Sequence, residues 1–352
     1  MKKVMTALLT LGMLLGSDLG SAAEKEYYPG AGSQLERSLI KRADEGRANA
    51  QYLLGYLWAY GVCRPRDLEK GIEFFRRAAE QGHAPALTEL GARYYDGAGA
   101  VGVERDLGQS FRLFLKAAEG GHAEAQFNVG IMLQNGEGVE RNFEEAARWY
   151  RRAAEQGYAP AQYNLGVSYR DGEGVPQSDE ESAGWYLKAA ENGDLRAQYN
   201  LGVCYRDGRG VSVDLAESVK WYRRAAERGF DEAQTYLGLI YEGGEGVEPD
   251  PAEAAKWYEL AAEQGHPRAQ YNLGVLYDTG VGVPKNQARA ADLYLMAARQ
   301  GHAKAMHNLG VSYRRGEGVP QNDELADRWL ANARREMVRQ AEEEAAESGS
   351  DR

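Results

Sequence analysis

A Leu-Gly pair recurs along this chain at a nearly constant interval. It stands at residues 54–55, 90–91, 165–166, 201–202, 237–238, 273–274 and 309–310, and Val129-Gly130 takes its place once. Successive pairs are 36, 39, 36, 36, 36, 36 and 36 residues apart, and the longer interval carries three extra residues within 97–103. A fixed period in this range is typical of a solenoid, in which each repeat packs against its neighbours. The sequence therefore predicts one repeat array instead of separate globular domains.

One period predicts two helices. Residues 160–170 carry apolar side chains at every fourth position, which is the spacing of one helix face. The stretch 171–176 contains two glycines and a proline and is expected to end this helix. A second helix is expected over 179–192, and Gly193 suits the left-handed position that follows a helix end. Each repeat is therefore expected to be an antiparallel pair of helices.

The glycine of the Leu-Gly pair needs a physical reason, because glycine inside a helix costs about 1 kcal/mol relative to alanine. The chain contains 43 glycines among its 352 residues, and this position holds glycine in every repeat. We expect close helix approach to be the cause. In the repeat with helices expected over 160–170 and 179–192, Gly166 would let the region of Ala189 and Ala190 of the second helix approach the first helix.

The consensus A-x-x-x-L-G-x-x-Y-x-x-G-x-G-V, followed by A-x-x-W-x-x-x-A-A-E-x-G, resembles the Sel-1-like repeat family, a relative of the tetratricopeptide repeat. The matching repeats cover residues 46–334. The resemblance implies an all-α fold, a right-handed superhelical solenoid of about eight two-helix repeats of 36 residues with N- and C-terminal capping helices. It further implies an exported bacterial member of this family.

The ends of the chain differ from the repeats. Residues 1–23 combine a positively charged start, an apolar run and small residues at a cleavage position, which predicts a secretory signal peptide. The protein is therefore expected to be exported, to the periplasm first of all, with secretion as the alternative. Residues 24–45 are expected to form a linker and a capping helix, with Ser33 and Glu36 spaced as a capping box. Residues 335–352 are expected to form a helix extension and an acidic tail that frays, because its glutamates oppose the helix dipole.

Charge and residue patterns exclude several function classes. The formal net charge is −11, which argues against a nucleic-acid partner. No integral membrane segment is expected in the mature chain, and no catalytic grouping or cofactor motif is visible. His83, His122, His266 and His302 share one column, about 9–10 Å apart if helices pack at their usual spacing, which is too far for one metal. Cys63 and Cys204 lie nearly four repeats apart, so we expect no disulfide between them.

The predicted binding surface is the concave groove, because tetratricopeptide arrays hold their partners on the first helices. The corresponding positions are Tyr163, Asn164, Val167, Arg170, Tyr199, Asn200, Val203, Arg206, Tyr271, Asn272, Val275, His307, Asn308, Val311 and Arg314. Asparagine is disfavoured inside helices, yet it recurs in one column of these positions. The asparagines either bond the backbone of an extended partner segment or bond neighbouring repeats to one another.

The resemblance implies a non-catalytic scaffold or adaptor in the bacterial cell envelope that binds a protein or peptide. Two alternatives stay open. One is the weak β-lactamase or penicillin-binding activity of cysteine-rich relatives, which carry a cysteine pair in each repeat that this chain lacks. The other is a module that binds peptidoglycan or another cell-wall glycan.

Overall fold

The structure is a computed structural model that describes residues 34–62, 65–97 and 103–349. The chain divides into two compact units, residues 1–178 and residues 179–352, called here the N-terminal and the C-terminal unit. The predicted signal peptide, Ser33, Cys63 and residues 350–352 lie outside the described residues.

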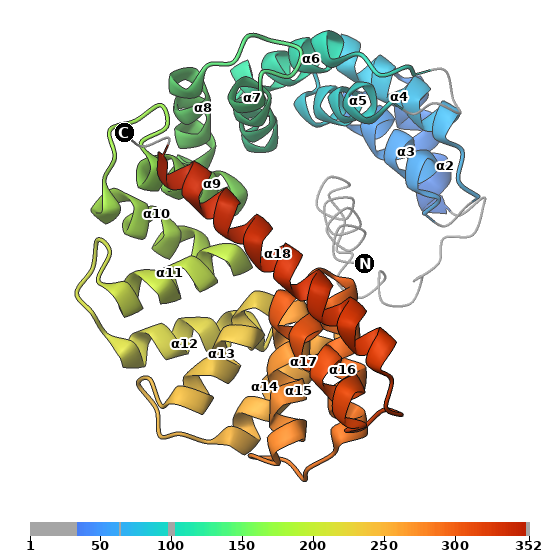
Figure 1. The fold of residues 1–352 in the computed structure, drawn as a ribbon. Coiled ribbons are helices and arrows are strands. Elements are labelled where there is room, and N and C mark those ends of the chain that lie inside the picture. The colour runs from blue at the N-terminus through green and yellow to red at the C-terminus, as the bar shows by residue number, and fades with distance from the viewer. Residues whose placement is uncertain (1–33, 63–64, 98–102, 350–352) are drawn as a thin grey trace. The chain divides into compact units, whose positions relative to one another are not determined.

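Helices make up both units (Figure 1). The N-terminal unit contains α2 (Gln34–Asp44), α3 (Ala48–Tyr60), α4 (Leu68–Glu80), α5 (Ala84–Asp96), α6 (Leu107–Glu119), α7 (Ala123–Asn135), α8 (Phe143–Glu155) and α9 (Ala159–Asp171). The C-terminal unit contains α10 (Asp179–Glu191), α11 (Leu195–Asp207), α12 (Leu215–Ala226), α13 (Asp231–Gly243), α14 (Pro251–Glu263), α15 (Pro267–Thr279), α16 (Gln287–Arg299), α17 (Ala303–Arg315) and α18 (Asp323–Gly349). The odd-numbered helices are the first helices of the repeats, and the even-numbered helices from α4 onward are the second helices.

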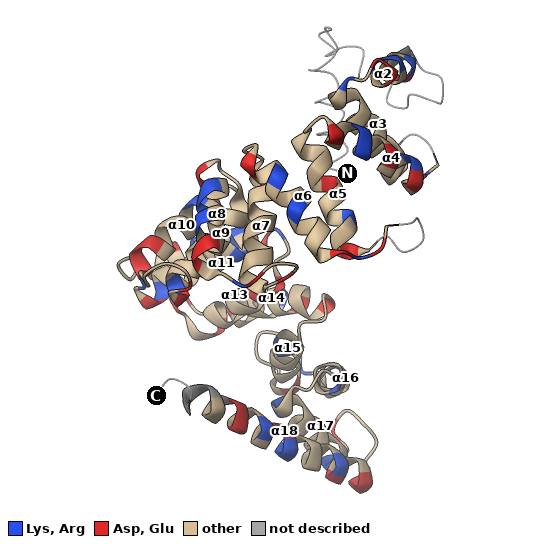
Figure 2. Ribbon diagram, turned by 90° about the horizontal axis from the view of Figure 1, so that it is seen from above, with Lys and Arg blue, Asp and Glu red and all other residues tan. Residues whose placement is uncertain are grey.

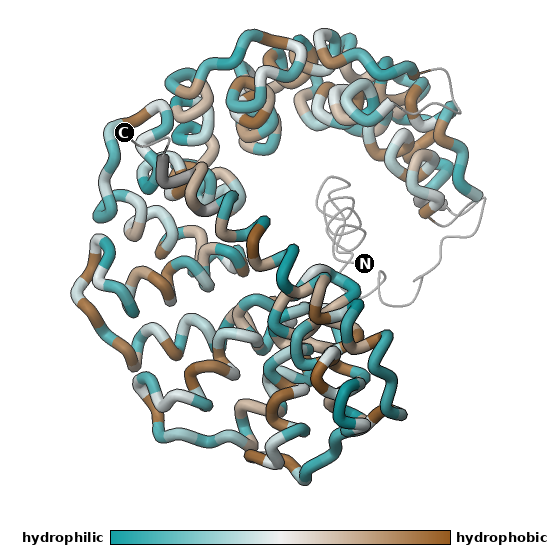
Figure 3. The backbone as a smooth tube through the Cα atoms, viewed as in Figure 1, coloured by the Kyte–Doolittle hydropathy of each residue, from teal (hydrophilic) through white to brown (hydrophobic). Residues whose placement is uncertain are grey.

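The helix pairs confirm the predicted all-α array. Within each unit a first helix packs against the second helix of its own repeat and against that of the preceding repeat, as α11 packs against α12 and α10. The first helices α5 and α7, and likewise α11 and α13, lie on the inner side of their unit (Figure 1). Hydrophobic residues alternate with hydrophilic ones along the helices (Figure 3), as expected for helices that bury one face.

The Leu-Gly glycine does allow a close approach, but the expected neighbour is wrong in the repeats where it can be seen. A Cβ atom added to Gly238 would lie 2.4 Å from Cε1 of Tyr258, a residue of the second helix with 0% exposure. The same contact joins Gly202 to Tyr222. A buried aromatic ring, and not the alanine pair, therefore fills the space beside this glycine.

The second glycine of each loop has a role beyond the predicted turn. Gly210 has a φ of 70°, and a Cβ atom there would lie 2.0 Å from the backbone oxygen of Asp179, at the start of the preceding second helix. Corresponding loop glycines approach the backbone of the preceding second helix in the same way. They are Gly138, Gly174, Gly246, Gly282 and Gly318. Each loop is thereby packed onto its neighbouring repeat.

A column of buried glutamines joins successive repeats. Gln234 Nε2 donates to the carbonyl oxygen of Ala226 at 3.0 Å, and Gln234 Oε1 accepts from Nε2 of Gln264 at 2.7 Å. The donation to a carbonyl oxygen eight residues earlier recurs at Gln51, Gln126, Gln162, Gln198 and Gln270. Each of these carbonyl groups also accepts a backbone N–H at the helix end, as Ala226 does from Gly229, so the glutamine adds a second donor. Sequence reasoning missed this column.

Helices at both ends of the described chain cover the array, as predicted. Leu39 and Ala43 of α2 are buried against Leu54 of α3. At the other end, a Cβ atom on Gly310 of α17 would lie 2.8 Å from Cγ of Leu330 in α18. The C-terminal helix α18 continues to Gly349.

Candidate partner-binding face of the first helices

The predicted groove residues lie on four first helices. Tyr163, Asn164, Val167 and Arg170 are on α9, in the N-terminal unit; Tyr199, Asn200, Val203 and Arg206 are on α11; Tyr271, Asn272 and Val275 are on α15; and His307, Asn308, Val311 and Arg314 are on α17. All are half-buried except His307 and Arg314, which are exposed. Three of the four sets therefore lie in the C-terminal unit, on α11, α15 and α17.

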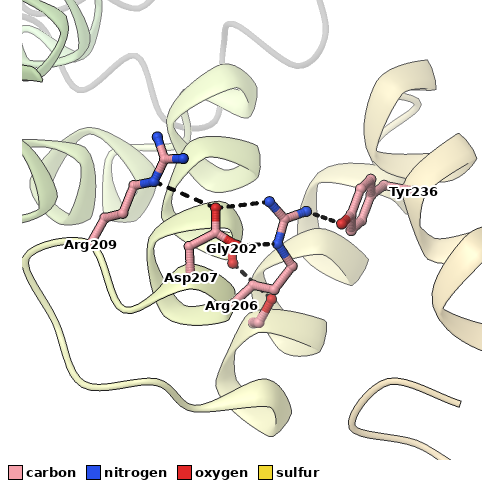
Figure 4. A network of polar contacts seen from close by, with 6 residues as sticks. Gly202, Arg206, Asp207, Arg209 and Tyr236 are labelled. Carbon is pink, nitrogen blue, oxygen red and sulfur yellow. Dashed lines mark hydrogen bonds and ion pairs between the residues drawn. The ribbon is translucent and has the colours of Figure 1, made fainter. Parts of the chain in front are cut away.

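Arg206 is fixed by several polar contacts (Figure 4). Its Nε donates to Oδ1 of Asp207 at 2.5 Å, and its Nη2 donates to Oδ2 of Asp207 at 2.9 Å. Its Nη1 donates to the hydroxyl group of Tyr236, on the neighbouring first helix α13. Arg209 adds an ion pair to Asp207, with Nε 3.5 Å from Oδ2. The hydrogen bond from Arg206 lowers the pKa of Asp207, and the same bond raises the pKa of Arg206.

Aromatic rings surround this arginine. The centroid of Tyr236 lies 4.8 Å from that of Tyr222 and 6.3 Å from that of Tyr199, and Tyr199 also contacts Phe230. Sequence reasoning missed Tyr236. It stands in a column that holds asparagine in five of the other first helices, so its departure from the asparagine of that column was the available signal.

The asparagine column lies against tyrosines of the preceding second helix. Burial raises the pKa of Tyr150, and a hydrogen bond from Asn164 acts in the opposite direction. Asn308 acts in the same way on Tyr294. These contacts support the interpretation that asparagines bond neighbouring repeats. Burial raises the pKa of Tyr258, and Asn272 acts in the opposite direction, although its buried Nδ2 has no hydrogen-bond partner of ordinary geometry within the described residues.

The N-terminal unit carries a second polar network on its first helices. The hydroxyl of Tyr60 donates to Oε2 of Glu89 at 2.9 Å, and Nη2 of Arg93 donates to the Tyr60 hydroxyl at 2.7 Å. Arg93 and Glu89 also form an ion pair at 3.3 Å. Sequence reasoning did not single out these residues, because they lie in repeats that depart from the consensus.

The histidine column serves the helix N-termini. The Nδ1 atoms of His83, His266 and His302 accept hydrogen bonds from the backbone N–H three residues later, at 3.2 to 3.4 Å. His122 Nδ1 instead lies 3.0 Å from Oγ1 of Thr88. No group of three or more candidate metal ligands is found among the described residues. Cys204 is buried and forms no disulfide with another described residue.

Comparison with known proteins identifies the repeat. The profile of the Sel1 repeat matches residues 48–83, 84–122, 123–158, 159–194, 195–230, 231–266, 267–302 and 303–335. In the part of the chain that the structure covers, no helix is long and apolar enough to span a bilayer.

Solved structures and one curated sequence are similar to the chain. The crystal structure of c5321, a protective antigen present in uropathogenic Escherichia coli strains, is 36% identical, with a TM-score of 0.77 over 85% of this chain and 64% of that one. A Sel1 repeat protein from Oxalobacter formigenes is 33% identical, with a TM-score of 0.66 over 86% of this chain and 87% of its own. The sodium-type polar flagellar protein MotX of Vibrio parahaemolyticus is 38% identical over 63 residues, which is 18% of this chain and 29% of MotX.

Proposed function

The chain belongs to the Sel1 repeat family, and we propose that its first helices bind an extended segment of a protein partner, with Arg206 as the central anchor. Sel1 repeat proteins generally mediate protein–protein interaction, and the Sel1 solenoid is typically a non-enzymatic scaffold. The observation that supports this site is the fixed position of Arg206 between Asp207 and Tyr236 (Figure 4).

Arg206 has the chemistry of an interface anchor. A guanidinium group carries five N–H donors, and the contacts to Asp207 and Tyr236 use Nε, Nη1 and Nη2 once each. One N–H on each Nη atom is therefore left to donate to a carbonyl or carboxylate oxygen of a partner. Because Asp207 already fixes the side chain, binding costs less conformational entropy than it would for a free arginine. Arginine and tyrosine are also the residues that most often dominate interface energies.

The neighbouring residues would complete the surface. Tyr199 and Val203 are half-buried residues of α11, the helix that carries Arg206. They contribute to the aromatic and aliphatic packing around Tyr222 and Phe230. A partner backbone that lies across α11 and α13 would contact these apolar groups and the arginine together. In this proposal the asparagines position the tyrosines of the second helices and do not contact the partner themselves.

We further propose that the protein acts in the bacterial cell envelope after export. Two observations support this location: the leader-like composition of residues 1–23, and the similarity of a 63-residue stretch to the flagellar protein MotX. Mass spectrometry of the protein recovered from the periplasm tests the proposal. We expect an N-terminus at Glu24, whereas full-length protein confined to the cytoplasm would contradict it.

Photo-crosslinking tests the binding face. Tyr199→p-azidophenylalanine places a nearly isosteric crosslinker beside Arg206. The matched control is Tyr241→p-azidophenylalanine, because the Tyr241 hydroxyl accepts a 2.5 Å hydrogen bond from Arg223 of the second helix α12. We expect the variant at position 199 to give one discrete adduct in envelope extract and the variant at position 241 to give none. Because Tyr241 lies on the first helix α13, on the side that faces Arg223 of α12, equal labelling at the two positions would argue against a site centred on Arg206.

A further inference from the structure

The last helix is about twice as long as any other second helix. α18 has 27 residues, whereas α14 and α16 have 13 each. Residues 336–349 therefore continue beyond the point at which the other second helices end. Within this extension, every side chain whose exposure is described is exposed, apart from that of Glu336.

Such an extension is barely stable by itself. Isolated helices of fewer than about 12–15 residues are marginal in water. Arg339 pairs with Glu336 at 2.5 Å and with Glu343 at 2.6 Å, but exposed ion pairs of this type contribute little. The length of the helix is better explained if another element packs against it.

An apolar face runs along the extension. Leu330 and Ala333 face α17, where they line a cavity with Met337. Met337 is 42% exposed and Val338 is 57% exposed. Ala341 lies one helical turn beyond Met337 and is exposed as well. The face that α17 covers in the first half of α18 thus continues without cover in the second half.

The cavity at the root of the extension is basic. It has a volume of about 320 Å³ and is lined by His307, Val311, Arg314, Arg315, Leu330, Ala333, Arg334 and Met337. Arg314 pairs with Asp327, and Arg315 lies 3.8 Å from Glu317. Arg334 makes no ion pair within the described residues.

The far half of the same helix is acidic. In the sequence, Glu342, Glu343, Glu344 and Glu347 follow the basic residues Arg334, Arg335 and Arg339. Figure 2 shows basic residues and then acidic ones along the described part of α18. Two such helices are complementary in charge only when they run antiparallel, because the basic half of each then lies beside the acidic half of the other. A surface that contacts its own copy in this way has two-fold symmetry.

We propose that the extension is a self-association surface, on which α18 of a second copy packs antiparallel along Met337, Val338 and Ala341. Glu342 and Glu343 of each copy then approach the basic cavity of the other. Ala341 allows close helix approach at the centre of the pair. The charge pattern favours a second copy over an unrelated partner, because one helix supplies both the surface and its complement.

Sedimentation equilibrium of the purified protein tests the proposal, using a matched pair of substitutions. Ala341→Glu places a charge on the apolar face, whereas Ala346→Glu places the same charge about 140° around the helix. Both alanines are exposed, so neither change disturbs the fold of a single copy. We expect a concentration-dependent dimer that Ala341→Glu weakens at least tenfold and that Ala346→Glu leaves unchanged. A protein that stays monomeric at all concentrations, or two variants that behave alike, would overturn the proposal.

A second pair tests the charge pattern. Arg334 lines the cavity, whereas the adjacent Arg335 does not and instead donates to Asn332. We expect Arg334→Glu to weaken the dimer several-fold and Arg335→Glu to have a smaller effect, with both differences reduced at high salt. If Arg334→Glu left the dimer unchanged while abolishing the binding of an added polyglutamate peptide, the cavity would serve an acidic partner, and a second copy would be excluded as its occupant.

Discussion

Tyr258 occupies the space that a side chain on Gly238 would need, and this contact explains why the column accepts glycine despite its cost in a helix. The requirement for close approach was predictable from the repetition of one glycine inside a helix. The identity of the neighbour was not, because the alanines and the tyrosine of the second helix recur with equal regularity, and only the three-dimensional structure tells which of them faces the glycine.

Substitution of two glycines in one helix separates packing from helix propensity. Gly238→Ala would force a Cβ atom to within 2.4 Å of Tyr258, so we expect a loss of about 1–3 kcal/mol in the free energy of unfolding. Gly243→Ala, at the end of the same helix, meets nothing within 4 Å and should be neutral or stabilising. Urea denaturation measures both. Equal destabilisation by the two changes would contradict the packing explanation.

Arg206 shows the limit of sequence reasoning at the scale of single residues. Its position on the first-helix face was predictable from the repeat. Its fixed geometry depends on Asp207 beside it and on Tyr236 in the next repeat, which replaces the usual asparagine. The contact between Arg206 and Tyr236 joins two different positions of neighbouring repeats. The 36-residue period alone does not predict such a contact.

At the scale of helices, the glutamine column links each first helix to the second helices on both sides. Gln234→Leu would remove the donor to the Ala226 carbonyl and the acceptor for Gln264. The Ala226 carbonyl keeps its bond from the Gly229 N–H, so the variant loses two hydrogen bonds of about 0.5–1.5 kcal/mol each, and we expect a decrease of about 1–3 kcal/mol in the free energy of unfolding. Chemical denaturation of Gln234→Leu beside Gln321→Leu, a change at an exposed glutamine, provides the measurement. A Gln234→Leu variant as stable as the control would show that the column is dispensable.

The histidines at the helix N-termini make stability depend on pH. Burial lowers the pKa of His83, His122, His266 and His302, and in His302 the positive charges of Lys304 and Arg268 lower it further. The unfolded chain therefore binds more protons than the folded chain, and stability is lost as the pH falls from about 6.5 through the lower pKa values of the folded state. We expect a lower Tm at pH 5.0 than at pH 7.5.

His302→Asn serves as the control for this pH dependence. Asparagine accepts the same hydrogen bond at a helix N-terminus and does not titrate. We expect the difference in Tm between pH 7.5 and pH 5.0 to become smaller in this variant. An unchanged difference would assign the pH dependence to other groups.

At the scale of the whole molecule, the repeat array should tolerate the removal of one period. Deletion of residues 195–230 removes α11 and α12 and joins Asp194 to Asp231, which continues the same alternation of helices. Because a solenoid is stabilised by contacts between neighbouring repeats, we expect this variant to fold with unchanged mean helicity and to unfold cooperatively. Deletion of residues 195–212, which removes only α11 and its loop, should leave an unpaired second helix and a much lower Tm. Circular dichroism would contradict the account if both deletions unfolded the protein.

The array as a whole was predictable because the period, the loop glycines and the helix spacing all repeat. The length of α18 was predictable in outline from the helix-forming residues that follow Trp329. Its combination of a basic cavity with an uncovered apolar face was not, because the cavity joins residues of α17 and α18 that only packing brings together.

The central claim, that Arg206 anchors a partner on the first helices, is tested most directly by two arginine variants in the crosslinking experiment. Arg206→Ala removes the group held between Asp207 and Tyr236, whereas Arg209→Ala removes the other arginine on Asp207 and leaves Tyr236 with its hydrogen bond. The yield of the adduct from position 199 is then measured for both. We predict that Arg206→Ala lowers it at least tenfold and that Arg209→Ala changes it less than twofold. Equal yields from the two variants would contradict the claim.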